Sequence, residues 1–446
     1  MLKRKIDNFL IDWKNRADKK PLIVKGARQV GKTASIRHFA QQQYNHIVEI
    51  NFALQRQYQG IFDDGYEVDT ILRNITLVNP QLVIVPGETL FFFDELQACP
   101  DCATSLKSFK QDGRYDVICS GSLMGVHYQQ IESNSVGYKE DMVMHSMDFE
   151  EFLWACGYDD RLTEDLLSHM IETRPLSALM MTRLTELFRQ YMVLGGMPEV
   201  VNTFVTQHHY GGTLTLQRQL LLDYEEDITK YAIGFEKAKV LAVYRHISTF
   251  LAQENKRFQV TKITQSARNR QYLGAVEWLD NAGIVNICYC LHELSLPLKG
   301  NYDPKRYKVY YRDTGLLIAS LDEEAQEDLR TNQNFATYKG AIYENIVADM
   351  LVKQGYNLFY YRNDKASIEM DFFVRSANHL WPVEVKASNT ASASLNKLTG
   401  PTSCRMQTDI KYGIKLCGSN IGFNGKFYTF PYFLTFLLKR WLRDQE

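Results

Sequence analysis

The first 150 residues alternate short apolar runs with stretches of helical period. Runs rich in β-formers and too short for helices predict strands, and they lie at 21–25, 46–50, 89–93 and 115–119. Between them, segments such as 33–42 predict helices. Strands that alternate with helices predict a parallel sheet covered on both faces.

The pattern becomes helical after about residue 152. Apolar residues three and four apart predict a bundle of helices at 162–174, 176–191 and 214–231. Helices at 238–253 and 271–281 flank a short polar helix near 261–268, and strands at 284–291 and 307–312 follow, joined by a loop around 297–304. Three helices and then a hairpin are the order of a winged helix. The acidic stretch 320–334 predicts a linker, and a helix followed by strands runs from about 338 to the C-terminus.

Composition narrows the class of protein. Fifty-one Lys and Arg residues against fifty-two Asp and Glu give a net charge of −1, so attraction to nucleic acid must come from a local patch. No run reaches the roughly 18–20 apolar residues that a membrane span needs, and we expect a cytoplasmic protein. Of eight cysteines, only Cys99 and Cys102 form a Cys-x-x-Cys pair, which is half a zinc site, so reduced thiols are the better interpretation.

One glycine-rich segment predicts a phosphate site. It fits Gly-x-x-x-x-Gly-Lys-Thr in full, directly after a strand and before a helix. Its backbone N–H groups would surround phosphate oxygens, Lys32 would reach the β- and γ-phosphates of ATP, and Thr33 would hold Mg²⁺. The predicted nucleotide-binding residues are Gly26, Ala27, Arg28, Gln29, Val30, Gly31, Lys32, Thr33 and Ala34.

The strand at 90–95 supports this site. Three phenylalanines precede Asp94 and Glu95, as in a Walker B strand that emerges at the ligand edge of the sheet. Asp94 suits the Mg²⁺ ligand and Glu95 the base that polarises the attacking water. The next strand ends in Cys-Ser-Gly-Ser, where Ser120 or Ser122 is a candidate sensor of the γ-phosphate; a serine-capped glycine turn is nearly as good an interpretation.

With these motifs, the chain resembles a family of prokaryotic AAA-type P-loop ATPases, related to the archaeal-type and signal-transduction ATPases, that carry a C-terminal restriction-endonuclease-like domain. The matching segments are 26–33, 93–97, 120–122, 144–153 and 195–200. In related ATPases the proline of Gly-x-Pro packs against adenine, which the resemblance implies for Pro198; the alternative is a simple helix break. A neighbouring subunit often supplies an arginine to such sites, so a homo-oligomer is expected as an option, and Arg114 is one candidate among several.

Two basic stretches fall within the predicted winged helix. Residues 255–276 carry five Lys or Arg and no acid, and the wing at 299–312 carries Lys299, Lys305, Arg306, Lys308 and Arg312 against Asp303. This local charge favours DNA as a partner. A winged helix that serves only as a lid extension or interaction module is the alternative.

Carboxylates recur in the C-terminal unit. A helix carries Glu344, one strand presents Asp371, and the next presents Glu384 and Lys386 on one face, because strand side chains repeat every two residues. An acid followed by Glu-x-Lys is typical of restriction endonucleases, and the resemblance implies that Glu344, Asp371 and Glu384 hold a metal while Lys386 assists catalysis. An amphipathic hairpin with surface charges is the alternative.

The expected fold class is therefore α/β: a P-loop AAA-type parallel sheet with a helical lid, a winged helix and a C-terminal PD-(D/E)xK-like domain. The expected domains are an ATPase core at 1–151, a lid at 152–237, a winged helix at 238–320, and a linker with the nuclease-like domain at 321–446. The expected function is Mg²⁺-dependent ATP hydrolysis acting on DNA. A signalling switch and a ring-forming protein remodeller are the alternatives.

Overall fold

The computed structural model describes residues 1–122, 135–232, 235–251, 272–321, 323–331, 339–386, 391–399 and 410–445. The chain divides into two compact units, Met1–Ser146 and Met147–Glu446. The division lies close to the expected end of the ATPase core at residue 151.

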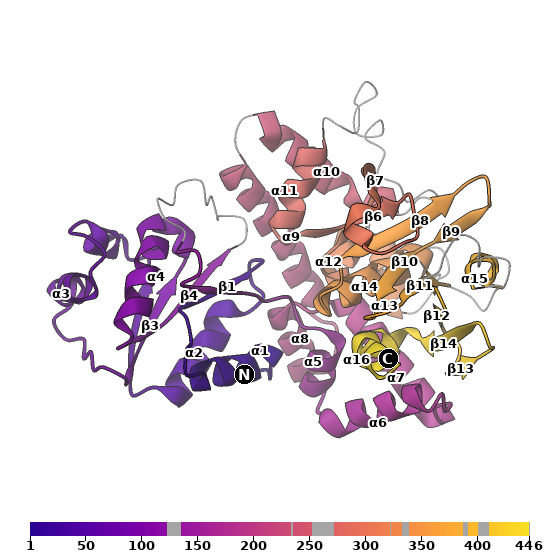
Figure 1. The fold of residues 1–446 in the computed structure, drawn as a ribbon, viewed down its shortest axis with the longest axis horizontal. Helices are drawn as coiled ribbons and strands as arrows, with labels where there is room; N and C mark the ends of the chain where they lie inside the picture. The colour runs from indigo at the N-terminus through magenta and orange to yellow at the C-terminus, as the bar shows by residue number, and fades with distance from the viewer. Residues whose placement is uncertain are drawn as a thin grey trace. The chain divides into compact units, whose positions relative to one another are not determined.

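The first unit is built on a parallel sheet (Figure 1). Its described strands run in the order β2-β3-β4-β1-β5, and every neighbouring pair is parallel. Phe91 and Phe93 pack on one face with α3 and α4, while the alternate residues Leu90 and Phe92 are also fully buried, so both faces are covered as predicted. The elements are α1 Lys5–Asn15, β1 Leu22–Gly26, α2 Lys32–Gln43, β2 His46–Asn51, α3 Val68–Val78, β3 Thr89–Asp94, α4 Pro100–Asp112, β4 Asp116–Ser122 and β5 Glu140–Val143.

Strand β5 was not predicted from the pattern. It is a sheet edge with exposed or half-buried residues throughout, including Glu140 and Asp141. A short polar strand carries no apolar run, and its pairing with β1 is what makes it a strand.

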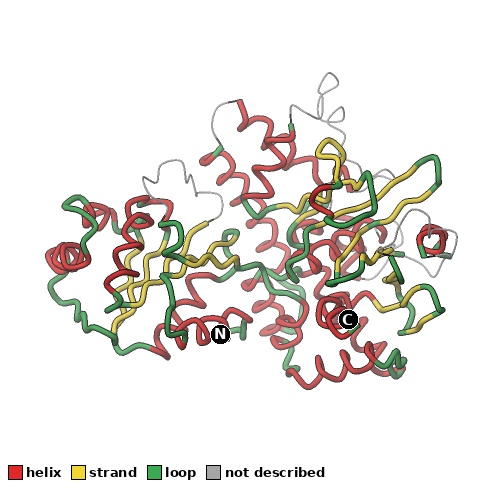
Figure 2. The backbone as a smooth tube through the Cα atoms, viewed as in Figure 1, coloured by secondary structure: helices red, strands yellow, loops and turns green. Residues whose placement is uncertain are grey.

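The second unit begins with helices, and its strands lie in the C-terminal part (Figure 2). Helices are present where the sequence predicted a bundle. Two further helices, α12 and α13, follow the strands β6 and β7. The described helices are α5 Phe149–Ala155, α6 Asp160–Ile171, α7 Ala178–Leu194, α8 Pro198–Gln207, α9 Thr213–Tyr231, α10 Phe235–Leu251, α11 Leu273–Asn281, α12 Thr314–Ala319, α13 Glu323–Thr331, α14 Lys339–Lys353, α15 Ala393–Leu398 and α16 Leu438–Asp444.

Two sheets are described in this unit. One has the order β7-β6-β8-β9 and the other β10-β11-β12-β14-β13. Both mix parallel and antiparallel pairs. The strands are β6 Val285–Leu291, β7 Tyr302–Tyr311, β8 Leu358–Asn363, β9 Ile368–Met370, β10 Phe372–Arg375, β11 Leu380–Val385, β12 Gly413–Cys417, β13 Gly422–Phe423 and β14 Phe427–Pro431.

The structure departs from the expected division of this unit in two places. The hairpin β6–β7, predicted as a separate wing, shares its sheet with β8 and β9 of the C-terminal part. The predicted linker contains α13, which buries Ala325 and Leu329 four residues apart. The many acidic residues on the exposed face of α13 are typical of a linker, which is why the sequence predicted one. The narrow apolar stripe on its other face packs against the protein, so the segment is a helix. The predicted polar helix near 261–268 lies outside the described residues.

Candidate functional site: the phosphate loop and the C-terminal carboxylates

The predicted phosphate loop joins β1 to α2, as its motif requires. Gly31 has a φ of +96° and begins α2, a conformation that glycine adopts without strain. A Cβ on Gly26 would lie 2.4 Å from the carbonyl oxygen of Met144, so this position also needs glycine. Arg4, which sequence reasoning did not identify, is buried and donates to the carbonyl oxygen of Val30 at 2.8 Å, bracing the loop.

Lys32 lies inside this loop. Its Nζ donates to the carbonyl oxygens of Gly26 and Ala27 at 3.0 and 2.8 Å, and its side chain is buried. Burial lowers the pKa of Lys32 to about 8, against the opposite effect of Glu95 and Asp94. The ammonium of Lys32 is therefore poorly solvated, and an anionic ligand nearby would stabilise its charged form.

Asp94 ends β3 at the centre of a polar cluster. Its carboxylate accepts hydrogen bonds from Thr33 Oγ1 at 3.2 Å, from Asn51 Nδ2 at 3.1 Å and from the hydroxyl of Ser120. Parallel strands deliver Asn51, Asp94 and Ser120 to the same sheet edge because their carboxyl ends coincide. The structure thus brings together the predicted residues Thr33, Asp94 and Ser120, and adds Asn51, whose position at the end of β2 was the available signal.

Glu95 follows with a φ of +58°, which is uncommon for a residue with a side chain. Its carboxylate accepts a hydrogen bond from the amide of Gln97, another residue that the sequence analysis did not select. Its backbone N–H donates to Asp94 Oδ1 at 3.1 Å. The turn places Glu95 next to Asp94. Its predicted role as the base that polarises the attacking water stays a prediction.

The loop and the Asp94 cluster fit a magnesium nucleotide. A glycine-rich loop before a helix and one ammonium suit phosphates, and the hydroxyl and carboxylate oxygens of Thr33 and Asp94 are the hard ligands that Mg²⁺ takes. The described residues 1–122 and 135–146 therefore contain the polar groups expected of an ATP site.

Two further predicted residues belong to other elements of the chain. Pro198 is the first residue of α8 in the second unit, and its contact with adenine stays a prediction. Arg114 precedes β4, at the opposite end of that strand from Ser120, and binds Asp112 and Asp69 at 2.6 Å. These ion pairs belong to its own unit, and the finger role also stays a prediction.

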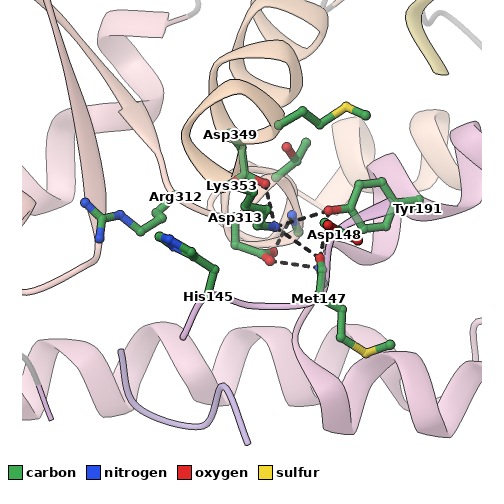
Figure 3. Close-up of polar contacts among 12 residues, drawn as sticks. His145, Met147, Asp148, Tyr191, Arg312, Asp313, Asp349 and Lys353 are labelled. Atoms are coloured by element: carbon green, nitrogen blue, oxygen red, sulfur yellow. Dashed lines mark hydrogen bonds and ion pairs between the residues drawn. The ribbon is translucent and has the colours of Figure 1, made fainter. Parts of the chain in front are cut away.

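The Gly-Gly-Met-Pro segment is bound to Met147, the first residue of the second unit. The backbone N–H of Met147 donates to the carbonyl oxygen of Gly196 at 2.7 Å. Lys353, at the end of α14, donates from Nζ to the carbonyl oxygen of Met147 and to the hydroxyl oxygen of Tyr191, each at 3.1 Å, and pairs with Asp349 at 2.7 Å (Figure 3). Helix α14 thus contacts Met147, the first residue of the second unit.

The C-terminal acids are each paired within the protein. Lys308 Nζ lies 2.9 Å from Glu344 Oε1, and both side chains are almost fully buried. The hydroxyl of Tyr310 donates to the same oxygen. Glu384 pairs with Lys386 at 2.9 Å, and Asp371 accepts from the backbone N–H of Val385 at 2.8 Å. The expected same-face placement of Glu384 and Lys386 is consistent with their ion pair.

These contacts do not fit a metal centre. Within the described part of the chain, no three His, Cys, Asp or Glu side chains are grouped so that they could hold a metal ion. Burial acts to lower the pKa of Lys308, but Glu344 and Asp371 outweigh it, so the pKa is raised and the ammonium stays charged. Glu344, Asp371 and Glu384 are therefore not grouped as a metal site among the described residues. Lys308 and Lys386 each pair with one of these acids, although the buried Oε2 of Glu384 has no hydrogen-bond partner there.

The predicted basic wing is smaller than its sequence suggested. Lys308 is buried against Glu344, and Arg312 is paired with Asp280 at 3.3 Å. Of the five cations, Lys299 and Lys305 are exposed and Arg306 is half-buried. The basic stretch 255–271 lies outside the described residues, and α11 carries an exposed acid, Glu277.

Comparison with known families divides the chain into three matched segments. Residues 18–153 match an AAA domain, 185–327 match a domain of unknown function, DUF8612, and 339–432 match another, DUF4143. None of the curated proteins matches the chain. No described helix is long and apolar enough to cross a membrane.

Solved structures resemble the chain at low identity. The Walker-type ATPase paby2304 of Pyrococcus abyssi is 14% identical, with 72% of this chain and 96% of that one covered and a TM-score of 0.42. The Orc1 protein of Aeropyrum pernix, solved in complex with DNA, is 12% identical, with 74% and 91% covered and a TM-score of 0.27. The family match and the parallel sheet, rather than these distant likenesses, identify the N-terminal part. The chain combines a P-loop AAA domain with C-terminal domains of unknown function.

Proposed function

We propose that this protein is a Mg²⁺-dependent ATPase whose nucleotide state controls how its second unit engages DNA. The observation that carries the proposal is the convergence of Lys32, Thr33, Asp94 and Ser120 at one edge of the AAA sheet. Within the described residues, a glycine-rich loop, a buried ammonium and oxygen atoms that could hold Mg²⁺ occur together at this edge.

The residues divide the work by their chemistry. Lys32 would neutralise the terminal phosphates, and Thr33 and Asp94 would hold the metal. Magnesium, when bound, neutralises charge that develops on the phosphate oxygens. Glu95, held by Gln97, would orient and polarise the attacking water. Ser120 already donates to Asp94, so it would sense the phosphate through that carboxylate.

Binding and turnover test these roles separately. Lys32→Ala should abolish nucleotide binding, and Glu95→Gln should retain binding but slow hydrolysis by roughly 100-fold or more, as loss of a general base does. Lys107→Ala, an exposed lysine on α4, is the matched control and should leave both unchanged. Normal turnover in Glu95→Gln would remove Glu95 from its role, and normal binding by Lys32→Ala would remove the site.

DNA engagement rests on the remaining exposed cations of the hairpin, Lys299 and Lys305, and on the charge pattern of the sequence. We expect ATP turnover to rise with single-stranded or duplex DNA, and the gain to fall steeply with salt because phosphate contacts release counterions. Turnover measured without additive, with each DNA form and with RNA identifies the polymer. Unchanged turnover in all four would contradict this part of the proposal.

A switch that acts on a protein partner is the second candidate. The contact of Lys353 with Met147 favours it, because α14 of the DUF4143 segment binds a residue within the segment 18–153 that matches an AAA domain. ATP-dependent changes in the protease sensitivity of the second unit, with no response to DNA, would support this candidate over the first. Gel filtration with and without ATP tests the ring-forming alternative.

A further inference from the structure

A cavity of about 460 Å³ lies in the second unit beside the hairpin, away from the carboxylates described above. Its walls come from α11, β6, β7, the end of α14 and the start of β8. The volume is within the usual range of small-ligand sites, roughly 300–1,000 Å³. None of its lining residues was selected for a ligand role by the sequence analysis, apart from two basic residues of the predicted wing.

A buried polar donor in this cavity has no acceptor among the described residues. Asn286 is 2% exposed, and its Nδ2 has no hydrogen-bond partner among the described residues. Its Oδ1 accepts from Arg312 Nε at 3.0 Å. Arg312 also donates from Nη2 to Asp280 at 3.1 and 3.3 Å, which leaves Nη1 for another acceptor. A buried donor without an acceptor is costly, so the site is suited to a ligand that presents oxygen atoms.

Aromatic rings form another part of the wall. Tyr289 and Tyr302 have ring centroids 4.7 Å apart, and Tyr302 lies 5.9 Å from Phe359. Tyr289 and Tyr302 are half-buried, so part of each ring is open to a ligand. Such rings stack on flat heteroaromatic groups without regard to their polar edges.

The rim adds positive charge. Lys299 lines the cavity and is exposed, and Lys305 is exposed further along the same hairpin. The acid that lines the cavity, Asp280, is already paired with Arg312. A phosphate group at the rim would therefore meet an ammonium, while the interior offers donors and rings.

We propose that this cavity binds one nucleotide whose base carries carbonyl oxygens, with the base against Tyr302, its oxygens toward Asn286 and Arg312, and its phosphate at Lys299. Thymine, uracil, cytosine and guanine meet this description, whereas adenine has no carbonyl oxygen. The nucleotide comes either from a single strand or from the free pool. The inference rests on the proposed engagement of nucleic acid but not on ATP hydrolysis.

The test uses the full-length Lys32→Ala protein without ATP, so that the phosphate loop does not contribute. Fluorescence anisotropy measures binding of fluorescein-labelled oligo(dT) and oligo(dA), each of about 15 nucleotides. Oligo(dT) should bind at least about tenfold more tightly. Tyr302→Leu should weaken oligo(dT) binding by roughly 5- to 150-fold, the range for loss of one stacked base, and Lys299→Ala should weaken it without affecting folding, because Lys299 is exposed.

Lys305→Ala is the matched control, since it removes an exposed cation of the same hairpin outside the cavity; any loss should be equal for the two oligonucleotides. Displacement of oligo(dT) by free dTMP assigns the site to the free nucleotide, and binding of oligo(dT) that dTMP does not displace assigns it to a strand. Equal affinity for oligo(dT) and oligo(dA), or full binding by Lys299→Ala and a folded Tyr302→Leu, overturns the inference. Such a failure leaves ATP turnover and its response to duplex DNA intact, and so is distinguishable from failure of the proposed function.

Discussion

The burial of the Lys32 ammonium predicts that nucleotide binding takes up a proton at alkaline pH. Its pKa falls from 10.5 to about 8 because burial within the loop disfavours the charged form. The difference is about 2.5 pH units, and at about 1.36 kcal/mol per unit it corresponds to roughly 3 kcal/mol. Phosphates of a bound nucleotide would offset this free-energy cost of burial by stabilising the ammonium. The pKa of Lys32 should therefore rise on binding.

The sign of the pH dependence follows from this linkage. Below pH 8 the lysine is charged both before and after binding, and affinity should not change through Lys32. Above pH 8 the free protein has lost the proton that the complex needs, so binding takes up a proton and affinity should fall about tenfold per pH unit. The nucleotide phosphates do not contribute, because their last pKa lies near 6.

Calorimetric titration with Mg²⁺ and ATP at about pH 9, in buffers of different ionisation enthalpy, measures the proton uptake directly. We expect close to one proton for the wild type. Lys32→Arg is the matched control, because a guanidinium stays protonated throughout this range; it should show no uptake and a flat affinity. Zero uptake by the wild type at pH 9, or equal uptake by Lys32→Arg, would refute the reasoning.

Three more outcomes test the second unit. Gly196→Ala places a Cβ 1.9 Å from the carbonyl oxygen of Met147, so thermal or urea unfolding should show a loss of about 3 kcal/mol; an unchanged midpoint would mean that the backbone yields without cost. Lys353→Met should lower the free energy of unfolding by about 3–5 kcal/mol, because it leaves the Asp349 carboxylate buried without its cation. Adding Asp349→Asn should recover part of that loss in the same unfolding assay. Mn²⁺ titration of the Lys32→Ala protein, followed by electron paramagnetic resonance, should detect no tight site; tight binding that Glu384→Gln abolishes would restore the metal centre.

Local patterns explain how well the first unit was predicted. The glycine spacing around Lys32 and the apolar run before Asp94 each require only neighbouring residues, and both specify their elements directly. The ends of parallel strands meet at one edge of the sheet, and there Thr33 and Ser120 both contact Asp94. Their roles toward a nucleotide stay predictions. Asn51 escaped notice because a single amide at a strand end has no motif around it.

The C-terminal part depended on contacts between residues far apart in the chain. Asp371 was expected within one strand, but the chain passes there from β9 in one sheet to β10 in the other. Lys308 was assigned to a basic wing, yet it pairs with Glu344, 36 residues away. A charge pattern does not show whether a side chain is solvated or buried, because that depends on which element packs over it.

The sequence by itself determined the phosphate loop, the parallel strands and most of the helices, since backbone geometry and apolar period are properties of adjacent residues. Only the tertiary structure decided which ions are paired: it buried Lys308 and Arg312, divided one strand between two sheets, and brought α14 to Met147. Ion pairing and burial depend on distances in space, which the order of residues does not reveal. In the low-dielectric interior a charge without a partner is costly, so the side chains that pack around each ion decide how it is paired.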